Sequence, residues 1–170
     1  MPALDAGLSS TGTTTVMLPN VAPGTWYVLA NADDAAGVAE TLETNNVKFA
    51  SVQVGPDFTV SLTVPSTAPA GSSISVTTVV RNAGAADAPG STVYFYLSAN
   101  PTFDGSDVRL DATRGVPALG PDLSNSGVTA VPLPPGTTGR WYLIAVADGA
   151  QVVIESNEAN NTAARAVQIN

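Results

Sequence analysis

The chain has 170 residues and contains neither cysteine nor histidine. Without cysteine it can form no disulfide bond and offers no thiolate as a nucleophile or metal ligand. Without histidine it lacks the usual pairing of a nucleophile with an imidazole base. Lysine occurs once, at Lys48, so a Ser–Lys pair would depend on that residue alone. A carboxylate pair such as Glu155 and Glu158 is the remaining catalytic option, and we predict that the chain is not an enzyme.

Positive charge is scarce as well. Six Lys and Arg residues stand against 14 Asp and Glu residues, which gives a net charge of −8, and the basic residues are scattered singly. Nucleic acids and anionic membranes attract clustered Lys and Arg, so neither is an expected partner. No apolar run approaches the ~18 residues of a transmembrane helix. No basic start followed by an apolar stretch marks a signal peptide in this segment.

What the sequence does contain is a long internal repeat. A constant shift of 115 residues aligns residues 1–55 with residues 116–170 without a gap, and it places Trp26 on Trp141. Self-similarity at a domain-sized period indicates an array of structural units. We therefore predict the second half of one unit at residues 1–55 and a complete unit at residues 56–170. Met1 falls in mid-unit, so we expect the chain to be a segment of a longer tandem protein.

Strand patterns fill the complete unit. Apolar and polar residues alternate, as in Phe58-Thr-Val-Ser-Leu-Thr-Val64, and clusters of Gly, Pro and Asn separate the segments. One segment, from Trp141 to Ala147, is apolar on both faces and is predicted to be central, with Trp141 in the core. The expected strands lie near residues 58–64, 74–81, 92–98, 108–112, 128–133, 141–147 and 164–169. About seven short strands predict an all-β, immunoglobulin-like β-sandwich.

Four segments, in this order and spacing, resemble the CARDB family, the cell-adhesion-related domain found in bacteria. They are SVTTVVRNAG at 75–84, VYFYLS at 93–98, WYLIAVAD at 141–148 and ESNEANN at 155–161. The resemblance covers residues 56–170 in full and residues 1–55 in half. It implies an immunoglobulin-like repeat of a large exported bacterial or archaeal protein, located outside the cell or on its surface. It implies no defined ligand.

The segment NPTFDGSD at residues 100–107 is a first candidate site. Its oxygen-bearing side chains, Asp104 and Asp107 among them, surround a glycine, and closely spaced oxygens suit a hard cation such as calcium. The alternative is a surface loop in which Asp and Ser stabilise turns through local hydrogen bonds. We prefer the loop interpretation and keep the calcium site as a hypothesis.

The repeated motif Glu-x-x-Glu-x-Asn-Asn is a second candidate, at residues 40–46 and 155–161. Asp33 and Asp148 precede the two copies at equal distance, across what the pattern predicts to be a hairpin loop. In the preferred interpretation the carboxylates accept backbone N–H bonds and pin the loop. In the other, Asp148, Glu155 and their neighbours bind calcium. No other cofactor is expected.

Tyr94 and Tyr96 lie on the face of their strand opposite Val93, Phe95 and Leu97. Exposed, they would form a patch for stacking on sugars or docking a protein. Otherwise they cover neighbouring strands through cross-strand pairing.

The sequence thus favours a non-catalytic structural or adhesion repeat. Residues 1–55 carry only the later strands of their unit, so the apolar face that includes Leu18, Trp26 and Val28 lacks its usual cover. We expect self-association or contact with neighbouring repeats, by strand complementation or exchange of halves, and a fibre where the association does not close. The alternative is a carbohydrate- or protein-binding accessory module of a secreted hydrolase, with a surface glycan or protein as partner.

Overall fold

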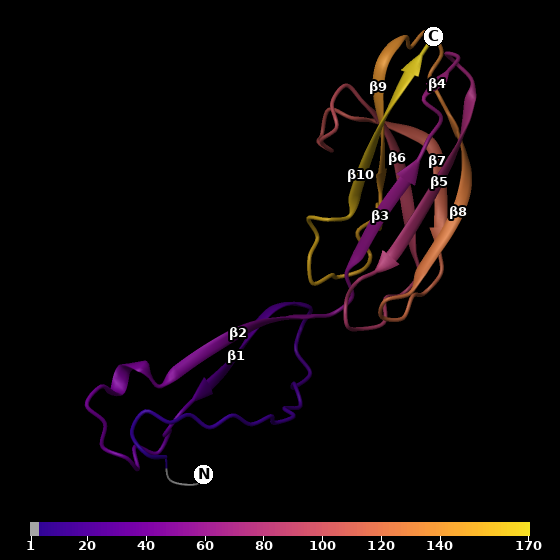
Figure 1. The fold of residues 1–170 in the computed structure, drawn as a ribbon. Helices are drawn as coiled ribbons and strands as arrows, with labels where there is room; N and C mark the ends of the chain where they lie inside the picture. Colours follow the sequence, from indigo (N-terminus) through magenta and orange to yellow (C-terminus); the bar gives the residue numbers. More distant parts are fainter. Residues whose placement is uncertain (1–3) are drawn as a thin grey trace.

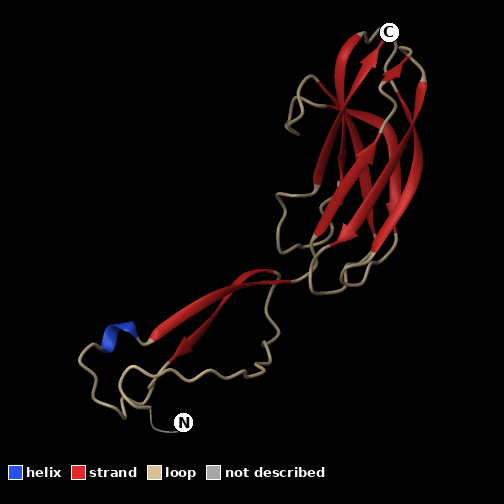
Figure 2. Cartoon of the chain, in the orientation of Figure 1, coloured by secondary structure: helices blue, strands red, loops and turns tan. Residues whose placement is uncertain are grey.

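The computed structural model describes residues 4–170 as strands joined by loops and turns, with one three-residue 3-10 helix, η1 at Glu43–Asn45 (Figures 1 and 2). No helix in these residues is long and apolar enough to cross a membrane. The predicted all-β class is confirmed. The strands are β1 (Gly24–Asn31), β2 (Val47–Val54), β3 (Phe58–Thr63), β4 (Thr67–Ala68), β5 (Ser73–Asn82), β6 (Ser91–Ser98), β7 (Val108–Val116), β8 (Ser124–Pro132), β9 (Gly139–Val146) and β10 (Thr162–Ile169).

Strands β3 to β10 form a sandwich of two sheets. One sheet has the order β3-β5-β8 and the other the order β4-β10-β9-β6-β7. Each of the seven segments expected from the sequence contributes a strand. The structure adds β4, which at two residues is too short to show an alternating pattern. Strand β9 lies in the middle of the larger sheet, as its two apolar faces predict.

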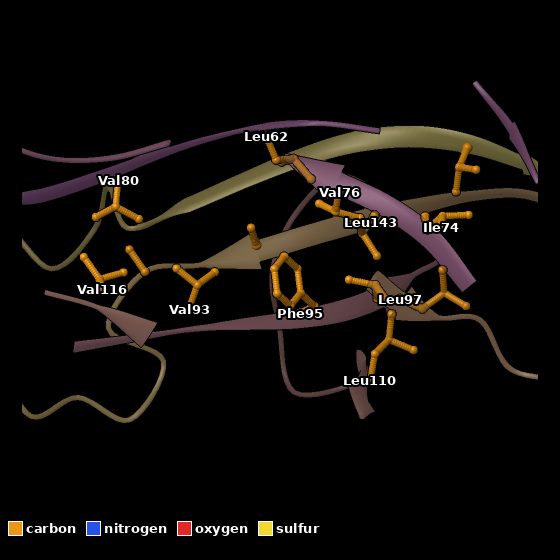
Figure 3. Close-up of a cluster of buried hydrophobic side chains, with 14 of the residues drawn as sticks. Leu62, Ile74, Val76, Val80, Val93, Phe95, Leu97, Leu110, Val116 and Leu143 are labelled. Atoms are coloured by element: carbon orange, nitrogen blue, oxygen red, sulfur yellow. The ribbon is translucent and has the colours of Figure 1, made fainter. Parts of the chain in front are cut away.

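The core lies between the two sheets and follows from the period-two pattern. In β5 every second side chain is buried, from Ile74 to Val80. Phe95 on β6 is fully buried, and its ring lies in the middle of the labelled cluster, with side chains from both sheets around it (Figure 3).

Trp141 lies at the edge of this core. The sequence predicted it between the sheets, whereas the structure leaves the ring partly exposed and packed against the buried cluster. The indole Nε1–H needs an acceptor, and it donates to the Thr138 carbonyl at 3.0 Å. Satisfying that donor keeps one side of the ring near solvent, so Phe95 takes the central place.

Strands β1 and β2 form a separate antiparallel hairpin that lies beyond one end of the sandwich (Figure 1). Its register, from Gly24 opposite Val54 to Asn31 opposite Val47, equals that of β9 and β10 after a shift of 115 residues. Residues 9–17, which correspond to β8, form no strand here. The boundary at residues 55 and 56 stays a prediction.

The turn at residues 82–84 holds the linker between the hairpin and the sandwich. The N–H of Ala85 donates to the Gly55 carbonyl at 3.1 Å, and the N–H of Ala83 donates to the Asp57 carbonyl at 2.6 Å. A Cβ on Gly84 would collide with the Gly55 and Asp57 backbone. The glycine is therefore required here by close packing of two chain segments.

Arg114 on β7 crosses the sandwich to the other sheet. Its Nε donates to Thr78 Oγ1 on β5 at 2.7 Å, and one terminal nitrogen donates to Asn125 Oδ1 on β8 at 2.5 Å. Gly127 leaves room for the side chain, because a Cβ there would lie 2.9 Å from the Arg114 Cδ. Burial lowers the pKa of the guanidinium. Arg114 thus closes the edge between β7 and β8 with polar contacts.

Candidate functional site

The loop between β9 and β10 gathers most of the buried acidic groups. Asp148 lies just after β9 with a left-handed φ of 44°, a conformation that Asp tolerates. Its side chain is 2% exposed, and its Oδ2 accepts the N–H of Val153 at 2.8 Å. The other oxygen, Oδ1, is buried and has no hydrogen-bond partner. Asp148 therefore stabilises the loop with one oxygen and leaves the second available.

Glu155 ties this loop to the opposite sheet. Its Oε2 accepts the N–H of Phe58, the first residue of β3, and its Oε1 accepts the Asn161 Nδ2–H at 2.9 Å. Glu158 Oε1 accepts the N–H of Glu155 at 3.0 Å. The carboxylates thus make the loop-pinning contacts of the preferred sequence interpretation. The contact with β3 is one the sequence did not indicate.

The surroundings of Glu155 disfavour its charged form. Burial raises the pKa of this carboxyl to about 7, and the nearby charges of Glu158 and Asp148 add to the rise. The hydrogen bonds from Phe58 and Asn161 act in the opposite direction and are outweighed.

We expect this raised pKa to make stability depend on pH. Between the ordinary value of 4.5 and about 7, the unfolded chain has released the Glu155 proton and the folded chain retains it. The free energy of unfolding therefore falls as pH rises through this window and levels off above it. The shift corresponds to about 3 kcal/mol at most, and less where solvent reaches the carboxyl.

Urea unfolding from pH 4.5 to 8 in the presence of EDTA measures this effect. Glu155→Gln keeps an acceptor oxygen but cannot ionise, so its profile should be flatter than that of the wild type. Glu40→Gln, at the exposed equivalent position in the other hairpin, is the matched control and should keep the wild-type profile. Equal pH profiles for the wild type and Glu155→Gln would contradict the prediction.

The first copy of the motif forms a similar loop. Glu43 Oε1 accepts the N–H of Glu40 at 3.0 Å, as Glu158 does for Glu155. Asp33, however, uses both oxygens, since Oδ1 accepts the N–H of Gly37 at 2.9 Å and Oδ2 that of Val38 at 2.8 Å. The loop geometry therefore forms locally, without a covering sheet. Among residues 4–170 the unpartnered carboxylate oxygen that is also buried belongs to the second copy, at Asp148.

A small cavity of about 180 Å³ lies beside Asp148. Asn161 lines it too, and its Oδ1 is buried without a hydrogen-bond partner. Glu158 adds a second carboxylate, and the lining contains no Lys or Arg. Among residues 4–170 no three His, Cys, Asp or Glu side chains are placed to hold a metal ion together. Sequence reasoning named Asp148 and Glu155 but not Asn161, although the conserved spacing in both copies was a signal for it.

The candidate loop at residues 100–107 is held by its own turns. Asp104 Oδ1 accepts the Ser106 N–H at 2.8 Å, and Asp107 Oδ2 accepts the Asp104 N–H at 2.9 Å. Hydrogen bonds from Ser106 lower the pKa of Asp104. Phe103 from this loop lines the cavity beside Asp148, so the two candidate loops are neighbours. Calcium binding by Asp104 and Asp107 stays a prediction.

Tyr94 and Tyr96 are both partly buried. The Arg109 guanidinium lies 3.7 Å from the centre of the Tyr94 ring, and Gly149 packs so closely that a Cβ there would collide with this ring. Tyr96 packs on Phe103 with ring centres 4.8 Å apart. Both rings thus contact neighbours from adjoining segments. A role in sugar or protein binding stays a prediction for them.

The hairpin presents an apolar face to solvent. Trp26 is 44% exposed and Val28 38%, and Leu18 is also exposed. These residues line one shallow hollow of about 150 Å³. On the opposite face Tyr27, Leu29 and Phe49 line another, of about 360 Å³. The face predicted to lack its cover is therefore open in this structure.

Comparisons with known proteins agree with the fold. The CARDB family model matches residues 55–165. No curated protein sequence matches the chain. A CARDB domain from Pyrococcus furiosus, crystallised in complex with di-metal ions, is 23% identical with a TM-score of 0.52, over 68% of this chain and 90% of its own. A domain from Methanosarcina acetivorans, whose parent is described as a cell surface protein, is 26% identical to this chain with a TM-score of 0.51. The match covers 69% of this chain and 94% of that domain.

Proposed function

Because the chain belongs to the CARDB family, we propose that it is a non-catalytic structural or adhesion repeat of an exported surface protein, and that it joins a second copy through its β1–β2 hairpin. CARDB is a cell-adhesion-related domain of surface proteins, which supports an extracellular or cell-surface location. The acidic, cysteine-free composition is compatible with that setting.

The difference between the two hairpins is the observation that carries this proposal. Leu143 on β9 is fully buried under the sheet β3-β5-β8, and its equivalent, Val28 on β1, is 38% exposed. Val167 on β10 is 1% exposed, while its equivalent, Val52, is only partly buried. The two hairpins have one register and closely similar inner faces, so they need the same kind of cover. An uncovered apolar face of this kind favours association.

The edges of the hairpin are open too. Strand β9 pairs with β6 and strand β10 with β4, whereas β1 and β2 pair only with each other. Each therefore offers a row of unpaired backbone N–H and C=O groups to a further strand. A partner can extend the sheet as well as cover its face.

The number of hairpins and covering sheets supports one mode of association. Residues 4–170 contain two second-half hairpins but one covering sheet, β3-β5-β8, which β9 and β10 occupy. Exchange of halves between two copies of these residues therefore leaves one hairpin in each copy uncovered. Two β1–β2 hairpins packed face to face leave none uncovered, and the contact closes with twofold symmetry. We accordingly favour a dimer over the fibre that exchange would build.

Sedimentation over a range of concentrations tests the proposal on the full chain. The wild type should dimerise, and Val28→Asp should remain monomeric because it places a charge in the apolar contact. Val128→Asp is the matched control, since Val128 on β8 is 69% exposed on the sandwich, and it should dimerise like the wild type.

Two results would overturn this mode of association. A wild-type chain that is monomeric throughout would show that no second copy covers the hairpin. A dimer or larger assembly that persists in Val28→Asp would show that another surface makes the contact. Thermal unfolding of both variants, followed by circular dichroism, checks that the sandwich remains folded.

A further inference from the structure

Three buried side-chain oxygens of the β9–β10 loop have no hydrogen-bond donor among residues 4–170, and two of them belong to residues that line one cavity. These two are Asp148 Oδ1 and Asn161 Oδ1, on side chains that are 2% and 6% exposed. Buried polar atoms without a partner are rare, because desolvating them costs free energy. Both atoms are acceptors, so only a species that donates hydrogen bonds or carries positive charge can satisfy them.

Hydrogen bonds fix the direction of both oxygens. The Asn161 Nδ2–H group donates to Glu155 Oε1 at 2.9 Å and lies 3.4 Å from Glu158 Oε2. Two carboxylates on the amide nitrogen leave the amide oxygen to point elsewhere, so the side chain cannot be turned round. The Val153 N–H holds Asp148 Oδ2 in the same way. The unpartnered oxygens are thus preorganised.

In the first hairpin the same motif leaves neither oxygen of the corresponding aspartate, Asp33, without a partner. There the N–H groups of Gly37 and Val38 satisfy both oxygens of Asp33. In the complete unit Val153 supplies the second bond, but Val152, the equivalent of Gly37, supplies none. The Asp148 loop is therefore the variant with a free carboxylate oxygen, and it alone is accompanied by a cavity lined by both Asp148 and Asn161.

The charge of the cavity selects the ligand. Asp148 and Glu158 bring negative charge to it, and no Lys or Arg lines it. We propose that this cavity binds a hard divalent cation such as Ca²⁺, through Asp148 Oδ1, Asn161 Oδ1 and the Glu158 carboxylate. Carboxylate and amide oxygens are the donors that Ca²⁺ prefers, and water completes its coordination. Glu155 is a positioning residue, because it orients Asn161.

Tyr96, which lines the same cavity, provides a spectroscopic reporter. Excitation of tyrosine sensitises the luminescence of a nearby Tb³⁺ ion, which takes the place of Ca²⁺. Titration of the full chain with Tb³⁺ should give one site per chain, and Ca²⁺ should displace the ion. Calorimetric titration with Ca²⁺ alone should give the same stoichiometry.

Asp148→Asn is the decisive variant. Its amide oxygen can still accept the Val153 N–H, and its NH₂ group then faces the cavity in place of an acceptor. We expect it to weaken Ca²⁺ binding by at least about tenfold. Glu158→Gln, which keeps an acceptor for the Glu155 N–H, should weaken binding by a similar factor. Asp33→Asn in the first hairpin is the matched control and should bind as the wild type does.

The results separate cation binding from simple hydration. No Ca²⁺ or Tb³⁺ binding by the folded wild type would mean that water alone fills the cavity, and it would overturn the proposal. Binding that survives both Asp148→Asn and Glu158→Gln but is lost in Asp104→Asn would place the ion in the neighbouring loop and overturn it equally. Thermal unfolding in EDTA establishes that each variant is folded, so that lost binding is not lost structure.

Discussion

Replacing Phe95 by alanine is expected to lower the free energy of unfolding of the sandwich by about 3–5 kcal/mol. The ring is fully buried in the cluster between the two sheets (Figure 3). Its removal loses the free energy gained by burying the ring, and it leaves a cavity. The surrounding strands cannot close this cavity, because β6 is paired with β7 on one side and with β9 on the other. Phe95 pairs with Ala145 on β9, the central strand, so its neighbours have little freedom to move. A loss of this size is a large part of the stability of a typical domain.

Urea unfolding followed by circular dichroism measures this change. Phe103→Ala is the matched control, because Phe103 is 38% exposed in the loop at residues 100–107. It should cost about 1 kcal/mol, since it loses mainly the contact with the Tyr96 ring. Equal losses for the two variants would mean that Phe95 is not at the centre of the core.

Replacing Asn82 by alanine is expected to cost about 2–4 kcal/mol, although no apolar contact explains the loss. The side chain is fully buried and all its hydrogen-bonding capacity is used. Its Oδ1 accepts the N–H groups of Asp57 and Gly84 at 3.1 and 3.0 Å. Its Nδ2 donates to the carbonyls of Ala86 and Leu119 at 2.7 and 3.0 Å. Alanine removes all four bonds; the Leu119 carbonyl keeps the Ala88 N–H, and the other three backbone groups lose the partner that Asn82 supplied.

Asn82→Asp separates the polar effect from the effect of size. The carboxylate fits the same space but offers no donor to the two carbonyls, so it should be at least as destabilising as alanine. Asn100→Ala is the control, because Asn100 is exposed and its Oδ1 accepts the Thr102 N–H at the surface. It should change the free energy of unfolding by less than about 1 kcal/mol. An Asn82→Asp protein as stable as the wild type would refute this account of the turn.

The fold was predictable where burial imposes a period. Alternation identified the seven longer strands of the sandwich and placed β9 at its centre. The same alternation also brings two polar residues to inward positions, Asn82 after Val80 and Arg114 after Leu110. Their roles depend on segments far away in the sequence, so the pattern marks the positions but not the contacts. Trp141 is the opposite case, an apolar residue that the pattern placed in the core. Its indole N–H needs an acceptor, and the ring therefore lies at the edge of the core.

For the candidate site, only the contacts between residues close together in the sequence were predictable. Repetition of the motif indicated that Asp148 and Glu155 stabilise a loop, and the same bonds form in both hairpins. The bond from Phe58 to Glu155 spans 97 residues, and no local pattern encodes it. The free oxygens of Asp148 and Asn161 depend on which backbone N–H groups the loop directs inward. That choice follows from the exact path of the chain rather than from the motif.

The parallel pairing of β4 with β10 affects how the sandwich resists a stretching force. The linker between β2 and β3 enters at one end of the sandwich, and the C-terminus of the chain lies at the other (Figure 1). Tension between these points pulls β10 and β4 in opposite directions along their lengths, because the two strands are parallel. The bonds from Gln168 N–H to the Ser66 carbonyl, at 2.9 Å, and from Asn170 N–H to the Ala68 carbonyl, at 3.0 Å, lie across that direction. They are sheared together instead of opening one after another, so a chain under tension resists extension before its core is exposed.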